Sequence, residues 1–179
     1  MPCHRSLVLT LLGAVPAHLA GQAIPFSQHG EVSQRIGLTD VSLSYNRPVA
    51  RGRVLFGPDG LVKWDRIWHP GADSATRLTV SRPVRLGGNP LPAGEYSLWL
   101  IPHADGPWTV IVSRAARVFH TPYPGEPEDL FRFEARPEPG SHMETLAWYF
   151  PVVARESAVL RLHWGTMVLP LTIDAPLAP

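Results

Sequence analysis

The chain has 179 residues, with 16 basic and 15 acidic residues, a formal net charge of +1 and a single cysteine. A near-neutral chain lacks the basic surface with which nucleic-acid-binding proteins neutralise phosphates, so we expect no nucleic-acid partner. Its 20 prolines and 15 glycines favour turns and disfavour a helical bundle.

The N-terminus has the pattern of a secretory signal peptide. Arg5 supplies a positive charge, an almost wholly apolar run follows, and small residues precede a cleavage site after Ala23. The run is shorter than the roughly 20 residues that cross a bilayer, and no later segment is apolar enough to do so. We therefore predict a signal peptide at residues 1–23 and a single periplasmic or secreted domain at 24–179, with no transmembrane segment. Cys3 lies inside the signal, so the mature chain has no disulfide and no catalytic cysteine.

Alternating apolar and polar residues predict strands along most of the mature chain. In residues 38–45, Val41, Leu43 and Tyr45 fall on one face of an extended chain and serines on the other. Further segments with strand character are 77–82, 95–101, 108–112, 130–136, 145–153, 158–164 and 166–173. Turn signals separate these segments, at residues 87–89, 91–94, 103–107 and 163–166. This pattern predicts an all-β fold, an antiparallel β-sandwich of about nine to ten strands.

Residues 45–76 form an unusually long connection between two predicted strands. Connections of this length in compact domains are commonly functional or disordered. This one contains Phe56, Trp64 and Trp68 among several arginines, so we expect it to be packed, either as a long loop or with a short helical turn near residues 61–68.

We expect the 45–76 segment to recognise a small polar or anionic ligand, or a carbohydrate. Residues 31–90 contain nine basic and five acidic residues, a local excess of positive charge that attracts anions. Arginines would supply the charge, a tryptophan a stacking face, and a His–Asp pair the orientation of the ligand. The candidate ligand-binding residues are Tyr45, Arg47, Arg51, Arg53, Trp68, His69, Asp73 and Thr76.

The residues leave alternatives open. The arginines could instead form ion pairs with the more acidic second half of the chain. His69 and Asp73 could act with an arginine in an envelope hydrolase or isomerase, or Asp73 could simply cap a turn. A structural envelope module without a small-molecule site is a third reading. The sequence has no metal-ligand spacing, phosphate-binding loop or nucleophile elbow, so we expect no metal and no cofactor, and catalytic residues stay unassigned.

Several short motifs along the chain resemble those of one protein family. They include Tyr45-Asn-Arg-Pro48, Arg51-Gly-Arg53, Trp68-His-Pro-Gly-Ala-Asp73 and Leu91-Pro-Ala-Gly-Glu-Tyr-Ser-Leu98. In this order they resemble the secreted bacterial family catalogued as domain of unknown function 2911. The resemblance implies a single extracytoplasmic domain without an established activity. Where the family usually has Trp-Arg-Thr-Gly-Ala-Asn-Glu, this chain has His69, Asp73 and Ser74 in place of arginine, asparagine and glutamate. Arginine is charged at any accessible pH and histidine is not, so this chain does not offer a permanent cation at position 69.

Overall fold

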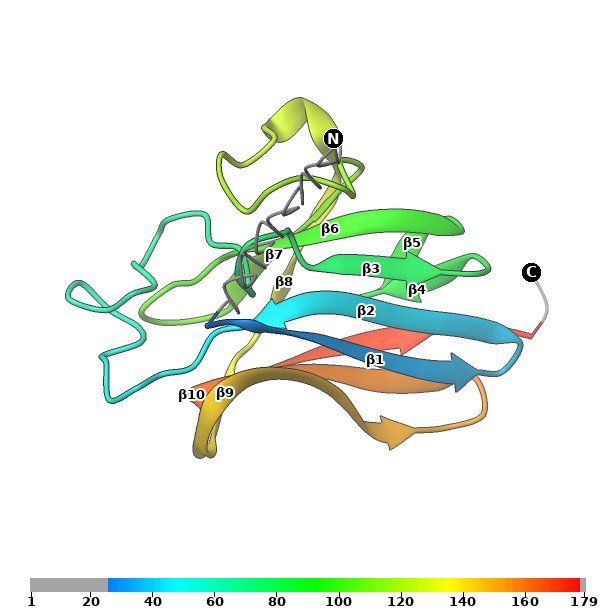
Figure 1. Ribbon diagram of the computed structural model, residues 1–179. Coiled ribbons are helices and arrows are strands. Elements are labelled where there is room, and N and C mark those ends of the chain that lie inside the picture. Colours follow the sequence, from blue (N-terminus) through cyan, green and yellow to red (C-terminus); the bar gives the residue numbers. More distant parts are fainter. Residues whose placement is uncertain (1–25, 178–179) are drawn as a thin grey trace, which may run out of the picture.

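A computed structural model describes residues 26–177, which fold into two layers of antiparallel strands (Figure 1). One sheet has six strands in the order β1-β2-β3-β6-β7-β8, and the other has four in the order β5-β4-β10-β9. The strands are β1 (Gln28–Ile36), β2 (Thr39–Arg47), β3 (Arg77–Val80), β4 (Val84–Leu86), β5 (Asn89–Leu91), β6 (Gly94–Ile101), β7 (Trp108–Ser113), β8 (Asp129–Ala135), β9 (Glu138–Val153) and β10 (Ser157–Asp174). This arrangement confirms the predicted antiparallel β-sandwich of about nine to ten strands.

The main core lies between the two sheets. On β2, Val41, Leu43 and Tyr45 are buried at every second position, as the alternation predicted. Leu78 and Val80 do the same on β3, which leaves Arg77 on the opposite, outer face of the six-stranded sheet.

A second, smaller cluster of buried side chains covers part of that outer face. It consists of Ala75, Trp99 and Ile111, with Val118 and Tyr123 packed against it. The chain between β7 and β8, which includes the 3-10 helix η1 (Glu126–Glu128), folds back over this cluster. The proline-rich stretch at residues 121–128 thus belongs to a connection within the domain.

The C-terminal strands differ from the prediction at one point. Residues 163–166 do not reverse the chain, because β10 runs without interruption from Ser157 to Asp174. Gly165 adopts a φ of 58° and the pairing with β9 shifts register on both sides of it. A left-handed glycine here produces a bulge in a continuing strand instead of a hairpin turn. Pro170 lies between the part of β10 that pairs with β9, up to Val168, and the part that pairs with β4, from Ile173.

The connection between β2 and β3 is a packed loop, which is one of the two predicted alternatives. Residues 61–68 contain bends and turns but no helix. Asp65 has a φ of 59°, which a right-handed helix excludes. The buried Val62 fixes the loop through a backbone bond from its amide to Leu55 O.

Two N-terminal predictions lie outside the described residues: the signal peptide at 1–23 and the cleavage after Ala23. Among the residues that are described, no helix has the length and apolar character required to cross a membrane.

Candidate functional site

Aromatic side chains hold the β2–β3 loop against the core at one end of the sandwich. Trp68 stacks on Trp164 with ring centroids 6.1 Å apart, and Phe56 contacts Trp68 edge-on at 5.8 Å. The Trp68 backbone also exchanges two hydrogen bonds with Leu100, of 2.7 and 2.8 Å. Trp68 is therefore fixed in position, with one indole face occupied by Trp164.

Backbone carbonyls, not carboxylates, accept the hydrogen bonds of two of the candidate arginines. Arg47 donates from Nε to Leu146 O at 3.0 Å. Arg53 donates to Ala50 O and Val49 O at 2.9 and 2.6 Å, which leaves one terminal nitrogen free of these bonds. The Arg51 guanidinium lies 4.2 Å from the centre of the Phe26 ring, while its backbone amide donates to Glu144.

The proposed alternative, in which these arginines pair with acidic residues of the second half, is not what the structure contains. Among residues 26–177, no arginine of residues 31–90 has a side-chain nitrogen within 4.0 Å of a carboxylate from residues 91–179. Arg35, for example, pairs with Asp40 in its own half.

His69 is buried and joined to Thr76. Its Nε2 accepts the backbone N–H of Thr76 at 2.5 Å, and the Thr76 hydroxyl donates to Pro70 O at 2.9 Å. Because Nε2 uses its lone pair in this way, the neutral ring carries its proton on Nδ1, which has no hydrogen-bond partner. Burial, with a smaller contribution from the charge of His120, lowers the pKa of His69 to about 3. The ring is therefore neutral at pH 7.

Asp73 joins two other segments to the β2–β3 loop. Its Oδ2 accepts from the Asn46 side chain at 2.9 Å, and its backbone oxygen accepts from His120 Nδ1 at 2.7 Å. Asp73 has a φ of 58°, a conformation that aspartate and asparagine tolerate better than most residues. Its carboxylate bonds to Asn46 and not to His69, so the predicted His–Asp pair does not form as a hydrogen-bonded unit.

Four of the eight candidate residues line one concave region, which we call the aromatic hollow. It has a volume of about 550 Å³. Trp99 and His69 are almost fully buried beside it, whereas Leu61 and Ile67 are 47% and 40% exposed. Its lining consists of Arg53, Leu61, Ile67, Trp68, His69, Gly71, Ala72, Asp73, Trp99, His120, Thr121 and Tyr123.

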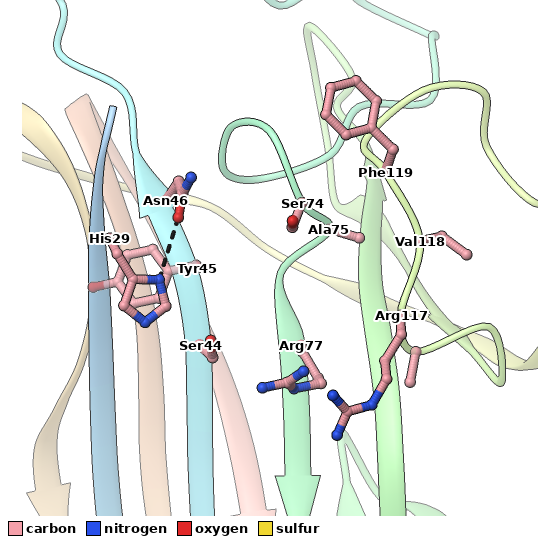
Figure 2. Close-up of a pocket in the computed structure, with 11 residues that line it drawn as sticks. His29, Ser44, Tyr45, Asn46, Ser74, Ala75, Arg77, Arg117, Val118 and Phe119 are labelled. Atoms are coloured by element: carbon pink, nitrogen blue, oxygen red, sulfur yellow. Dashed lines mark hydrogen bonds between the residues drawn. The ribbon is translucent and has the colours of Figure 1, made fainter. Parts of the chain in front are cut away.

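A second concave region, the arginine hollow, has a volume of about 400 Å³ and lies between β2, β3 and the chain after β7 (Figure 2). Figure 2 shows Arg77 on β3 between residues of β1 and β2, such as Ser44, and the segment that carries Arg117, Val118 and Phe119. Its lining contains no carboxylate and consists of His29, Ser44, Tyr45, Asn46, Ser74, Ala75, Arg77, Ala116, Arg117, Val118 and Phe119.

The other four candidate residues do not contribute their polar groups to the aromatic hollow. Tyr45 borders the arginine hollow, but its hydroxyl accepts from Trp148 N at 2.9 Å on the core side. Thr76 is fully buried and positions His69. Arg47 and Arg51 line neither hollow.

The two hollows share a wall. Residues 73–75 pair with residues 118–120 through bonds from Ala75 N to Val118 O and from His120 N to Asp73 O, of 2.9 and 2.8 Å. Sequence reasoning missed the second half of this wall. No local pattern indicates that residues 116–123 return to meet residues 73–75.

His69 is not available as the base of the alternative hydrolase or isomerase. Arg53, His69 and Asp73 do line one hollow, but Arg47 does not, and the Nε2 lone pair of His69 is already engaged. Within residues 26–177, no group of three His, Cys, Asp or Glu side chains is placed to hold a metal ion.

Fold and surface together define a class: an antiparallel sandwich with two adjacent concave regions on the outer face of its larger sheet. The family described as "protein of unknown function (DUF2911)" matches residues 27–173, and the chain belongs to this family. Comparisons with curated proteins and with solved structures gave no match.

Proposed function

We propose that the protein binds a neutral, polyhydroxylated ring, such as a sugar, in the aromatic hollow. The observation that carries this proposal is the composition of the lining, which combines aromatic side chains with polar groups of both signs. Its volume of about 550 Å³ falls within the range of small-molecule sites, roughly 300–1,000 Å³.

The polar groups of the aromatic hollow are better suited to the several hydroxyls of a sugar than to a ligand with a single charge. Arg53 offers a donor, the Asp73 carboxylate has one oxygen not used by Asn46, and Thr121 can both donate and accept. His120 donates from Nδ1 to Asp73 O, so its Nε2 is an acceptor in the neutral ring. A guanidinium and a carboxylate at one site oppose each other's effect on a charged ligand, which favours a neutral one.

The apolar surface of the hollow suits the C–H face of a sugar ring. Trp68 and Tyr123 are half-buried, and Leu61 and Ile67 extend the apolar surface at the rim. Aromatic and aliphatic groups of this kind bind the ring faces while polar groups fix the orientation.

A titration with neutral monosaccharides tests the proposal. Glucose, galactose and N-acetylglucosamine are added to the purified protein, and binding is followed by tryptophan fluorescence and thermal shift. We expect saturable binding of at least one sugar, weakened at least ten-fold by Ala72→Phe, which fills the hollow, and by Asp73→Asn, which removes the charge in a left-handed position that asparagine accepts.

Asp59→Asn is the matched control, because Asp59 is exposed in the same loop and does not line the hollow. No saturable binding of any of the three sugars, or equal binding by the wild type and Ala72→Phe, contradicts the proposal.

A further inference from the structure

Arg77 is the central cation of the arginine hollow. It is directly opposite Ser44 of β2 and Ser97 of β6 in the sheet register. Because Leu78 and Val80 point into the core, the Arg77 side chain lies on the outer face, where Figure 2 shows its guanidinium extending from β3.

The side chain of Arg77 has no ion-pair or hydrogen-bond partner among residues 26–177. No carboxylate lies within 4.0 Å of its side-chain nitrogens, and its Nε is shielded from solvent without a hydrogen-bond acceptor. The Arg77 Nε is too shielded for a ligand to reach, but the terminal nitrogens of the guanidinium also have no acceptor among residues 26–177, and a bound oxyanion would accept charge-assisted bonds from them.

The carboxylates around the hollow are engaged elsewhere. Glu95 accepts two bonds of 2.9 Å from Arg117, and Asp73 accepts from Asn46. Glu31, which is two strands away from Arg77 in the register, lies 3.3 Å from His29 Nε2. None of them lines the hollow, so nothing on its surface competes with an external anion for Arg77.

The rest of the lining is suited to a small organic anion. The hydroxyls of Ser44 and Ser74 are hydrogen-bond donors that can assist Arg77. Across the hollow, Ala116, Val118 and Phe119 present an apolar surface, with Phe119 55% exposed. A volume of about 400 Å³ is much larger than a bare oxyanion and leaves room for an apolar body.

We propose that the arginine hollow is a second binding site, which takes a small organic molecule through its carboxylate or phosphate group. Arg77 binds the oxyanion in a bidentate manner, and the apolar part of the ligand packs against Val118 and Phe119. The site is separate from the aromatic hollow and does not depend on sugar binding there.

Three probes that share a phenyl ring distinguish the effect of charge from that of shape. They are the anions benzoate and phenyl phosphate, and neutral benzamide. Binding is measured by calorimetry and by the NMR signals of the arginine Nε–H groups, where the signal that Arg77→Lys removes is assigned to Arg77. We expect saturable binding of benzoate, phenyl phosphate or both, a shift of the Arg77 signal on binding, and no saturable binding of benzamide. Whichever of the two anions binds more tightly shows whether the site prefers a carboxylate or a phosphate group.

Two variants test the role of Arg77 in different ways. Arg77→Gln should weaken anion binding at least ten-fold. Ser44→Asp places a carboxylate beside Arg77, so it should remove anion binding while raising the melting temperature, which excludes misfolding as the cause. The matched control is Arg82→Gln, because Arg82 is an exposed arginine just after β3 that does not line the hollow.

The proposal is overturned if neither anion binds saturably, if benzamide binds as well as benzoate, or if Arg77→Gln and Ser44→Asp bind like the wild type. Sugar binding by these two variants should be unchanged, so failure here is distinguishable from failure of the aromatic hollow.

Discussion

The two hollows lie side by side on the same face of the same sheet, yet their linings differ in one physical respect. In the aromatic hollow, a guanidinium and a carboxylate occur together among ring side chains. In the arginine hollow, Arg77 has neither a carboxylate in the lining nor one within 4.0 Å among residues 26–177. The scaffold fixes where ligands can bind, and the local balance of charge sets which ligands these are.

The largest effect is expected from His69, the buried histidine that lines the aromatic hollow. His69→Phe leaves the buried amide of Thr76 without its acceptor, which should cost about 2–3 kcal/mol of unfolding free energy. Urea unfolding measures this loss. Because His69 lines only the aromatic hollow, sugar binding should weaken more than benzoate binding in the folded variant, and an equal loss at both hollows would contradict this expectation.

Acidification should act through the same residue. The folded pKa of His69, about 3, lies below its ordinary value of 6.5, so the unfolded state takes up the proton first as the pH falls. This contribution to stability is complete above pH 6.5 and is lost progressively down to about pH 3. Between pH 6 and pH 4 we expect a loss of about 2 kcal/mol from this group.

The control for the pH effect is His69→Gln, which can accept from Thr76 N–H but does not titrate. Urea unfolding at several pH values should give a flatter profile for this variant. Parallel profiles for the variant and the wild type would assign the acid sensitivity to other groups.

A smaller effect is expected at the shared wall. Asn46→Ala removes the bond to Asp73 that connects β2 to the loop, which should lower the unfolding free energy by about 1 kcal/mol. Since Asn46 borders one hollow and Asp73 the other, both binding constants should fall. Ser33→Ala, at an exposed position on β1 that lines neither hollow, serves as the comparison. A change confined to one hollow would contradict a common wall.

The smallest effect is expected at the rim. Arg117 pairs with Glu95 through two bonds of 2.9 Å, but 68% of the Arg117 side chain is exposed, so Arg117→Gln should change stability by less than about 1 kcal/mol. Benzoate binding should weaken less than in Arg77→Gln. If calorimetry shows a larger loss of benzoate affinity in Arg117→Gln than in Arg77→Gln, Arg117 and not Arg77 is the main anion-binding residue.

The fold could be predicted from the sequence to the extent that each strand carries its own alternation. Val41, Leu43 and Tyr45 are buried as the period of two requires. Strand β1 was not predicted, although Val32, Gln34 and Ile36 alternate with more exposed neighbours. Gly165 was read as a reversal because a glycine between two strand patterns has the same local signature for a bulge and for a turn.

The candidate site was predicted only in part, because its second half comes from elsewhere in the chain. The 45–76 segment contributes Arg53, Trp68, His69 and Asp73 to the aromatic hollow. His120 and Tyr123 meet them only through the pairing of residues 73–75 with 118–120, which depends on tertiary structure. Arg77 has the appearance of an ordinary outward strand residue, and its lack of a partner is visible only in three dimensions.

The small cluster of Ala75, Trp99 and Ile111 beneath residues 118–123 has a consequence for local stability. Because only this small apolar cluster and the bonds to residues 73–75 hold the covering strap, we expect it to open locally while the sandwich beneath stays folded. Amide protons of residues 118–120 should then exchange with solvent faster than those of β6 and β7. One opening event would dismantle both concave regions together, and a ligand in either one would keep the strap closed and so favour occupancy of the other.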